Sequence, residues 1–94
     1  MMRICVLETR LNLPGVHSLK QKRGIIKGLL SRIRNRFEVA AAEVAHQDSW
    51  QVAGLGFACV GTNVPKLQSR MNNVVNYIDN SGTALLADYQ VEVL

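Results

Sequence analysis

The sequence is poor in the residues that most often mark a metal, cofactor or catalytic site. Its two cysteines, Cys5 and Cys59, lie in separate apolar segments without a CxxC spacing. There is no HxxxH or HExxH pair, no nucleophile elbow and no glycine-rich phosphate loop. We therefore expect buried free thiols, no metal and no cofactor, and an enzyme is the least favoured of the functions considered.

Long apolar runs are absent as well. No segment approaches the ~18 apolar residues of a membrane-spanning helix, and the start, MMRICVLETR, lacks the layout of a secretory signal peptide. Apolar residues make up 48% and charged residues 19% of the 94 residues, which is typical of a globular chain. We expect one domain over residues 1–94, located in the cytoplasm and without a membrane partner.

Acidic residues are missing from the stretch that carries most of the positive charge. Residues 17–37, HSLKQKRGIIKGLLSRIRNRF, hold seven of the eleven basic residues and none of the seven acidic ones. The net charge of +4 is therefore +7 in this stretch and −3 elsewhere. Such localised charge indicates a surface for an anionic partner rather than a general basic bias.

The same stretch has the strongest helical pattern. Ser18 suits the N-cap position, and Gln21 suits the reciprocal bond of a capping box. Apolar side chains repeat to form one stripe: Leu19, Ile26, Leu29, Leu30, Ile33 and Phe37. Four basic residues, here named the ridge, follow on one flank of that stripe: Lys20, Arg23, Lys27 and Arg34. We predict a helix from Ser18 to Phe37 with a buried face and an adjoining basic ridge.

The rest of the chain predicts four strands and a second helix. Alternating apolar residues place the strands at 2–13, 38–46, 51–60 and 85–94. In the last strand, Leu85, Tyr89, Val91 and Val93 are expected to face the core. The second helix is capped by Asn63, with Pro65 in its first turn. The order βαββαβ predicts an α+β, ferredoxin-like sandwich: a four-stranded antiparallel sheet with both helices on one face. Glu43, in the strand 38–46, fits the core poorly.

Four runs of this sequence are similar to the YlxP-like bacterial family, called domain of unknown function 503. They are LPGVHSLKQKR (13–23), RNRFEVAAAEV (34–44), HQDSWQ (46–51) and DYQVEVL (88–94). The resemblance covers essentially the whole chain. It implies a ferredoxin-like fold and a cytoplasmic bacterial protein, often encoded among genes for translation and ribosome maturation. It brings no established catalytic activity and no agreed site.

The function that these observations favour is a nonenzymatic module that binds RNA or another polyanion through the ridge. The competing interpretation is a solvated helix face without a partner. Aromatic residues are not expected on the open face of the sheet, which instead carries Glu8, Asp88 and Glu92. RNA should therefore bind on the helix side, by phosphate contact and shape rather than by stacking on the sheet.

A second candidate site lies at one end of the predicted sheet. The topology is expected to bring the start of the basic helix, the turn 46–50 and Asp79-Asn80 together, around His17, Ser18, His46, Asp48 and Trp50. Free amides and the helix dipole favour an anion there, so the alternative function is a homo-oligomeric module for a small anionic ligand. The competing interpretation is that Ser18 caps the helix, Asp48 fixes the turn and Trp50 covers the sheet end.

The open face of the sheet predicts self-association. Small and apolar residues form a strip across its two central strands: Ile4, Val6, Val52, Gly54, Gly56 and Ala58. An exposed apolar strip is a common association patch. We therefore expect a homodimer or a higher oligomer that covers it.

Overall fold

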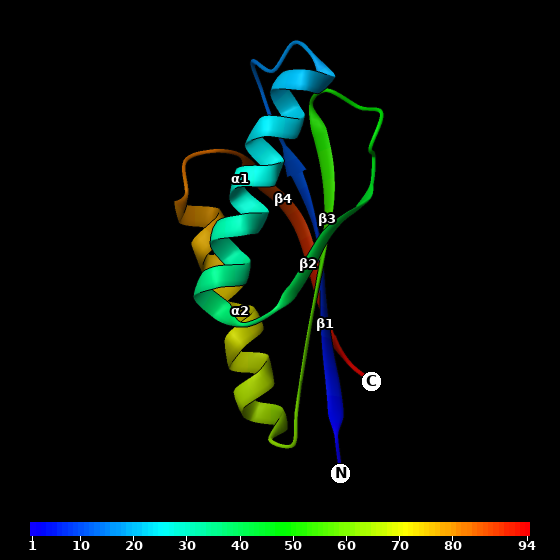
Figure 1. The fold of residues 1–94 in the computed structure, drawn as a ribbon, viewed down its shortest axis with the longest axis vertical. Coiled ribbons are helices and arrows are strands. Elements are labelled where there is room, and N and C mark those ends of the chain that lie inside the picture. The colour runs from blue at the N-terminus through cyan, green and yellow to red at the C-terminus, as the bar shows by residue number, and fades with distance from the viewer.

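The order of elements in the structure, a computed structural model that describes residues 1–94, is βαββαβ, as predicted. The elements are β1 (Arg3–Asn12), α1 (Leu19–Phe37), β2 (Ala40–Ala45), β3 (Val52–Gly61), α2 (Val64–Asn80) and β4 (Leu85–Val93). The strands form one antiparallel sheet in the order β2-β3-β1-β4, with both helices on one face (Figure 1). The predicted ferredoxin-like α+β sandwich is therefore confirmed.

The core lies between the sheet and the helices. Alternate residues of β1, Cys5, Leu7 and Leu11, are fully buried, and Thr9 between them donates a hydrogen bond from its hydroxyl to the Leu55 carbonyl at 3.3 Å. Both helices bury one stripe: Ile26, Leu29, Leu30 and Ile33 on α1, and Leu67, Met71, Val74, Val75 and Ile78 on α2. Each such side chain contributes roughly 1.5–3 kcal/mol through burial.

The caps of both helices match the prediction, with one difference. Ser18 Oγ accepts a hydrogen bond from the Gln21 amide at 3.0 Å, and Asn63 Oδ1 accepts one from the Lys66 amide at 3.1 Å. The side chain of Gln21 accepts from the amide of His17 at 3.1 Å instead of from that of Ser18. The capping interaction of α1 is therefore displaced by one residue, and it orders the loop before the helix.

The start of β4 departs from the predicted alternation. Asp88 pairs with Arg10 but Leu86 pairs with Leu11, so one extra residue bulges between them. The bulge reverses which side chains face the core, so Leu86 packs there while Leu85 is 61% exposed. The prediction that Leu85 faces the core was wrong for this reason. Tyr89 shares the core side with Thr9 but remains half exposed at the sheet edge.

The open face of the sheet is less continuous than the strip predicted from sequence. Gly54 is buried, because Ala45 of β2 lies so close that a Cβ on Gly54 would come within 2.7 Å of its side chain. Val44 likewise covers Gly56, at 3.0 Å from the position of a Cβ there. A register shift between Glu43 and Ala45 brings these side chains over β3. The exposed apolar surface therefore includes Val44 and Val60 at its margins.

Candidate functional site

The ridge is open to solvent along one flank of α1. Lys20, Arg23, Lys27 and Arg34 are all exposed, and none has a carboxylate within ion-pair distance. Arg34 alone is tethered, because its Nε and Nη2 donate to the carbonyl of Ala41 at 3.3 and 3.0 Å. Three of the five guanidinium N–H groups of Arg34 remain free. The predicted ridge residues thus lie together and available, with one anchored against the edge strand.

Lys22 is the exception among the basic residues of α1. Its side chain is 1% exposed, and its Nζ lies 2.9 Å from Glu43 Oε2. It also donates a hydrogen bond to the carbonyl of His46 at 2.6 Å. Burial of a charge needs such partners, since an unpaired buried ammonium is very costly. Lys22 therefore ties α1 to β2 and the following turn and is not available to a ligand.

Sequence reasoning missed this pair although both members were irregular. Lys22 falls inside the apolar stripe, between Leu19 and Ile26, and Glu43 had no satisfactory place in its strand. Glu43 pairs with Leu55 across the sheet and so faces the helices. The two misfits are each other's partner. A buried basic position on the helix and a core-facing acid in the strand were the signal.

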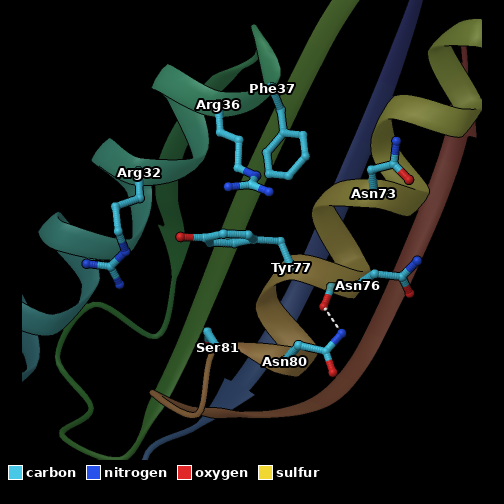
Figure 2. Close-up of a pocket in the computed structure, with 8 residues that line it drawn as sticks. All are labelled: Arg32, Arg36, Phe37, Asn73, Asn76, Tyr77, Asn80 and Ser81. Carbon is cyan, nitrogen blue, oxygen red and sulfur yellow. Dashed lines mark hydrogen bonds between the residues drawn. The ribbon is translucent and has the colours of Figure 1, made fainter.

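A second basic surface lies on the opposite flank of α1, where it faces α2. We call it the groove. It is a cavity of about 730 Å³ lined by Arg32, Arg36, Phe37, Asn73, Asn76, Tyr77, Asn80 and Ser81 (Figure 2). No acidic residue lines it. Sequence reasoning did not name these residues, although the polar positions of α2 recur at helical spacing.

Aromatic rings hold one arginine of the groove in place. The guanidinium carbon of Arg36 lies 5.5 Å from the centroid of the Tyr77 ring and 5.7 Å from that of Phe37. The two rings pack edge to face, 5.5 Å apart at 74°. Figure 2 shows Tyr77 reaching from α2 toward α1, with Arg36 above its ring and Arg32 beyond its hydroxyl. Cation–π contacts of this kind orient the guanidinium while leaving its N–H edge free.

The groove continues into a smaller cavity of about 360 Å³. The two cavities share Arg36, Phe37 and Asn73. The smaller one adds two cations, Lys66 and Arg70, and one acid, Glu38. Arg70 Nη1 donates to the backbone carbonyl of Glu38 at 3.3 Å, which fixes Arg70 at the junction of α1 and β2. A continuous basic channel therefore follows the seam between the helices.

The predicted site at the sheet end forms in part. His17, Asp48 and Trp50 line a cavity of about 440 Å³ with Ser49 and Gln51. Trp50 is 51% exposed, so its indole does not seal the core. The carboxylate of Asp48 is part of the lining, which is unfavourable for an anion.

Three other residues assigned to this end serve elsewhere. The hydroxyl of Ser18 caps α1, and His46, with φ of 58°, turns its carbonyl to Lys22. Asn80 lines the groove beside Arg32 and Arg36 rather than approaching the N-terminus of α1. The expectation for Asp79-Asn80 was wrong because α1 begins well beyond the end of α2 (Figure 1).

The cysteines lie opposite each other in the centre of the sheet. Cys5 of β1 pairs with Cys59 of β3, and both thiols are free and buried, as predicted. Burial raises the pKa of both thiols, and the guanidinium of Arg70 partly counteracts the rise in the pKa of Cys59. No cluster of three or more His, Cys, Asp and Glu side chains could hold a metal ion. Neither helix is long and apolar enough to cross a membrane.

Comparison with known proteins adds the family. A sequence model of the family described as "Protein of unknown function (DUF503)" matches residues 4–91. The chain belongs to this family. The "Uncharacterized protein YlxP" of Bacillus subtilis (strain 168) is 35% identical over 63 residues, which cover 67% of this chain and 68% of that protein. The family resemblance noted in the sequence is therefore confirmed.

Solved structures similar to this DUF503 domain support the fold alone. The de novo designed protein Foldit4 matches with a TM-score of 0.56 at 10% identity, over 100% of this chain and 97% of the design. An amidase (hydantoinase/carbamoylase family) from Burkholderia phymatum matches with a TM-score of 0.55 at 16% identity, over 100% of this chain and 28% of the amidase. The NE2512 protein of unknown function from Nitrosomonas europaea gives 0.52 at 14% identity, over 100% and 88% of the two chains.

Proposed function

We propose that this DUF503 domain is a nonenzymatic module that binds RNA through phosphate contacts made by α1. The observation that carries the proposal is that six basic side chains of this helix are exposed and none is paired with a carboxylate: Lys20, Arg23, Lys27, Arg32, Arg34 and Arg36. Surface cations without acidic neighbours attract a polyanion over long range and release its counterions on contact. The setting expected from the family resemblance is translation or ribosome maturation.

The salt dependence of RNA affinity tests this function. Four ridge contacts predict that log affinity falls with log salt at a slope of about −3, taking 0.7–0.9 per contact. The probe is a labelled single-stranded RNA of about 12 nucleotides, within the ~4–16 nucleotide sites of small RNA-binding domains. Fluorescence anisotropy from ~50 mM salt upward measures the affinity.

A ridge variant makes the test specific. Changing Lys20, Arg23 and Lys27 to Ser should remove most of the slope, and unlike a change at Arg34 it leaves the anchor on Ala41 intact. A matched control changes Arg3 and Arg10, basic residues of β1, to Ser. The control should keep the slope. Absence of binding by the parent protein at low salt, or an equal loss in variant and control, would contradict the proposal.

The second candidate function is binding of a small anion at the sheet end. The observation that favours it is the cavity that brings His17 and Trp50 together beside the start of α1. Phosphate titration followed by amide NMR should then shift residues 17–21 and 46–50 together, and more strongly below pH ~6.5, where histidine becomes charged. We rank it second because Asp48 lines the same cavity.

A further inference from the structure

The groove contains arginines that the fold itself does not use. Arg3, Arg34 and Arg70 each donate to a backbone carbonyl. Arg32 and Arg36 are exposed and have neither a hydrogen-bond acceptor nor a carboxylate partner within the chain. Two guanidinium groups therefore present up to ten unpaired N–H donors to one cavity. Planar guanidinium donors match the oxygens of a phosphate in a bidentate manner.

The side chains around these arginines restrict their motion and add base-binding chemistry. Arg36 lies over Phe37 and Tyr77, so less conformational entropy is lost when it binds an anion. Asn73 and Asn76 carry free amide groups, which offer both a donor and an acceptor, whereas Asn80 Nδ2 donates to the Asn76 carbonyl at 2.9 Å. A lone inorganic anion has no use for acceptors. A nucleotide does, because base edges and 2′-hydroxyls donate as well as accept.

The shape of the groove favours a strand over a discrete ligand. The cavity is shared at Arg36, Phe37 and Asn73 with the next one, which leads to Lys66 and Arg70. Cations thus continue along the seam between α1 and α2 beyond the space that one phosphate fills. Unstacked bases of a single strand can enter such a seam, whereas an A-form duplex presents a wide, stiff surface. Glu38, at the far end, is the one acidic side chain along the channel.

We propose that the groove is the site that holds single-stranded RNA, with Arg32 and Arg36 binding one phosphate and the amides of α2 contacting the adjoining nucleotide. This inference rests on the proposed function and deepens it. The ridge attracts the polyanion, and the groove fixes a strand of it in place. The ridge binds by charge alone, whereas the groove distinguishes a flexible strand from a duplex.

The test compares variants that remove the same charge from the two surfaces. One changes Arg32 and Arg36 to Gln, and the other changes Lys20 and Lys27 to Gln. Both should lower the salt slope by about 1.4, since each lost contact with a single strand removes about 0.7. The groove pair should in addition weaken binding of the single-stranded RNA about tenfold more than the ridge pair, because it removes oriented charge-assisted hydrogen bonds. Thermal unfolding confirms that both variants are folded.

The outcomes separate this inference from the function on which it rests. If the parent protein binds no RNA at low salt, both fail. If the parent binds RNA and the two variants weaken it equally, RNA binding stands and the groove site is overturned. A duplex of the same sequence should bind the parent more weakly and should not distinguish the two variants. Equal affinity for the duplex, or for AMP or UMP alone, would overturn the single-strand assignment.

Discussion

The two basic flanks of α1 differ in what surrounds them. On the ridge, Lys20, Arg23 and Lys27 project into solvent without a neighbouring element. In the groove, Arg32 and Arg36 face the amides and aromatic rings of α2 (Figure 2). Mobile surface charges supply attraction that any polyanion can use, while oriented guanidinium groups supply geometry. Equal charge on one helix therefore does not imply an equal role.

Lys22 extends the comparison to a third environment. It is a basic residue of the same helix, yet it is buried against Glu43. Glu43 Oε2 accepts no well-aligned hydrogen bond, so the contact is primarily an ion pair. The charge of α1 is thus divided among an open flank, a groove and the core. The predictions below test that division.

The largest effect is expected when the buried pair is broken. Glu43→Leu leaves the ammonium of Lys22 in the core with only the His46 carbonyl as partner. We expect the free energy of unfolding to fall by about 3–5 kcal/mol. The double change Lys22→Met with Glu43→Leu should recover most of it, because both charges are then gone. Urea denaturation measures both. A loss below ~1 kcal/mol in the single variant would assign Lys22 to the exposed group instead.

A smaller effect is expected on the opposite side of the molecule. The homodimer predicted from the open face would leave both helix layers exposed, so that each dimer carries two ridges and two grooves. Ala42→Arg places a charge on the exposed apolar surface, and it replaces the Gly56→Arg test because Val44 crowds Gly56. A charge buried without a partner should weaken the dimer about 100-fold.

Light scattering at micromolar concentration measures that change. The parent protein should show more than one chain and Ala42→Arg should shift to a monomer. Asn72→Arg, on an exposed position of α2, is the control and should stay associated. A monomeric parent would remove the dimer and leave one groove per molecule.

The elements of this fold were predictable because their signals are local. Ser18 and Asn63 cap the helices as expected, and the apolar stripe of α1 lies in the core. The failures come from contacts between elements. The bulge in β4 and the turn of Val44 and Ala45 over β3 depend on strand pairing, which alternation does not encode.

The candidate site was predictable only in part, for a related reason. The ridge follows from one helical wheel, so its four residues were found together. The groove needs two helices, and its residues become neighbours only when the offset between α1 and α2 is known. The same offset separates Asn80 from the sheet end. Residue types could be assigned from sequence, but their grouping required the packing of the helices.

The comparison of the flanks can be sharpened by exchanging the two kinds of cation. Arg36→Lys keeps the charge but loses the planar fork that packs over Tyr77. We expect binding of single-stranded RNA to weaken about three- to tenfold, with an unchanged salt slope. Lys27→Arg on the ridge should change neither quantity by more than about twofold. If both exchanges have the same effect, the groove contributes charge alone.

The smallest effect is expected at Glu38, where the groove channel meets the end of α1. This residue caps the helix with φ of 54° and ψ of 56°, a left-handed conformation that costs a side chain about 1–2 kcal/mol. Glu38→Gly removes that strain but increases the freedom of the unfolded chain, so we expect a net gain of about 0.5–1 kcal/mol. The bond from Arg70 survives because it reaches the backbone carbonyl. Chemical denaturation measures the gain.

A second variant separates the charge of Glu38 from its backbone strain. Glu38→Gln keeps the left-handed conformation and removes the carboxylate from the channel. Both variants should bind single-stranded RNA about twofold more tightly at low salt, since an exposed charge near a phosphate contributes up to ~1 kcal/mol. Only Glu38→Gly should also be more stable. If RNA affinity is unchanged in both, the strand does not extend past Arg36, and the site is limited to the larger cavity between Arg32 and Tyr77.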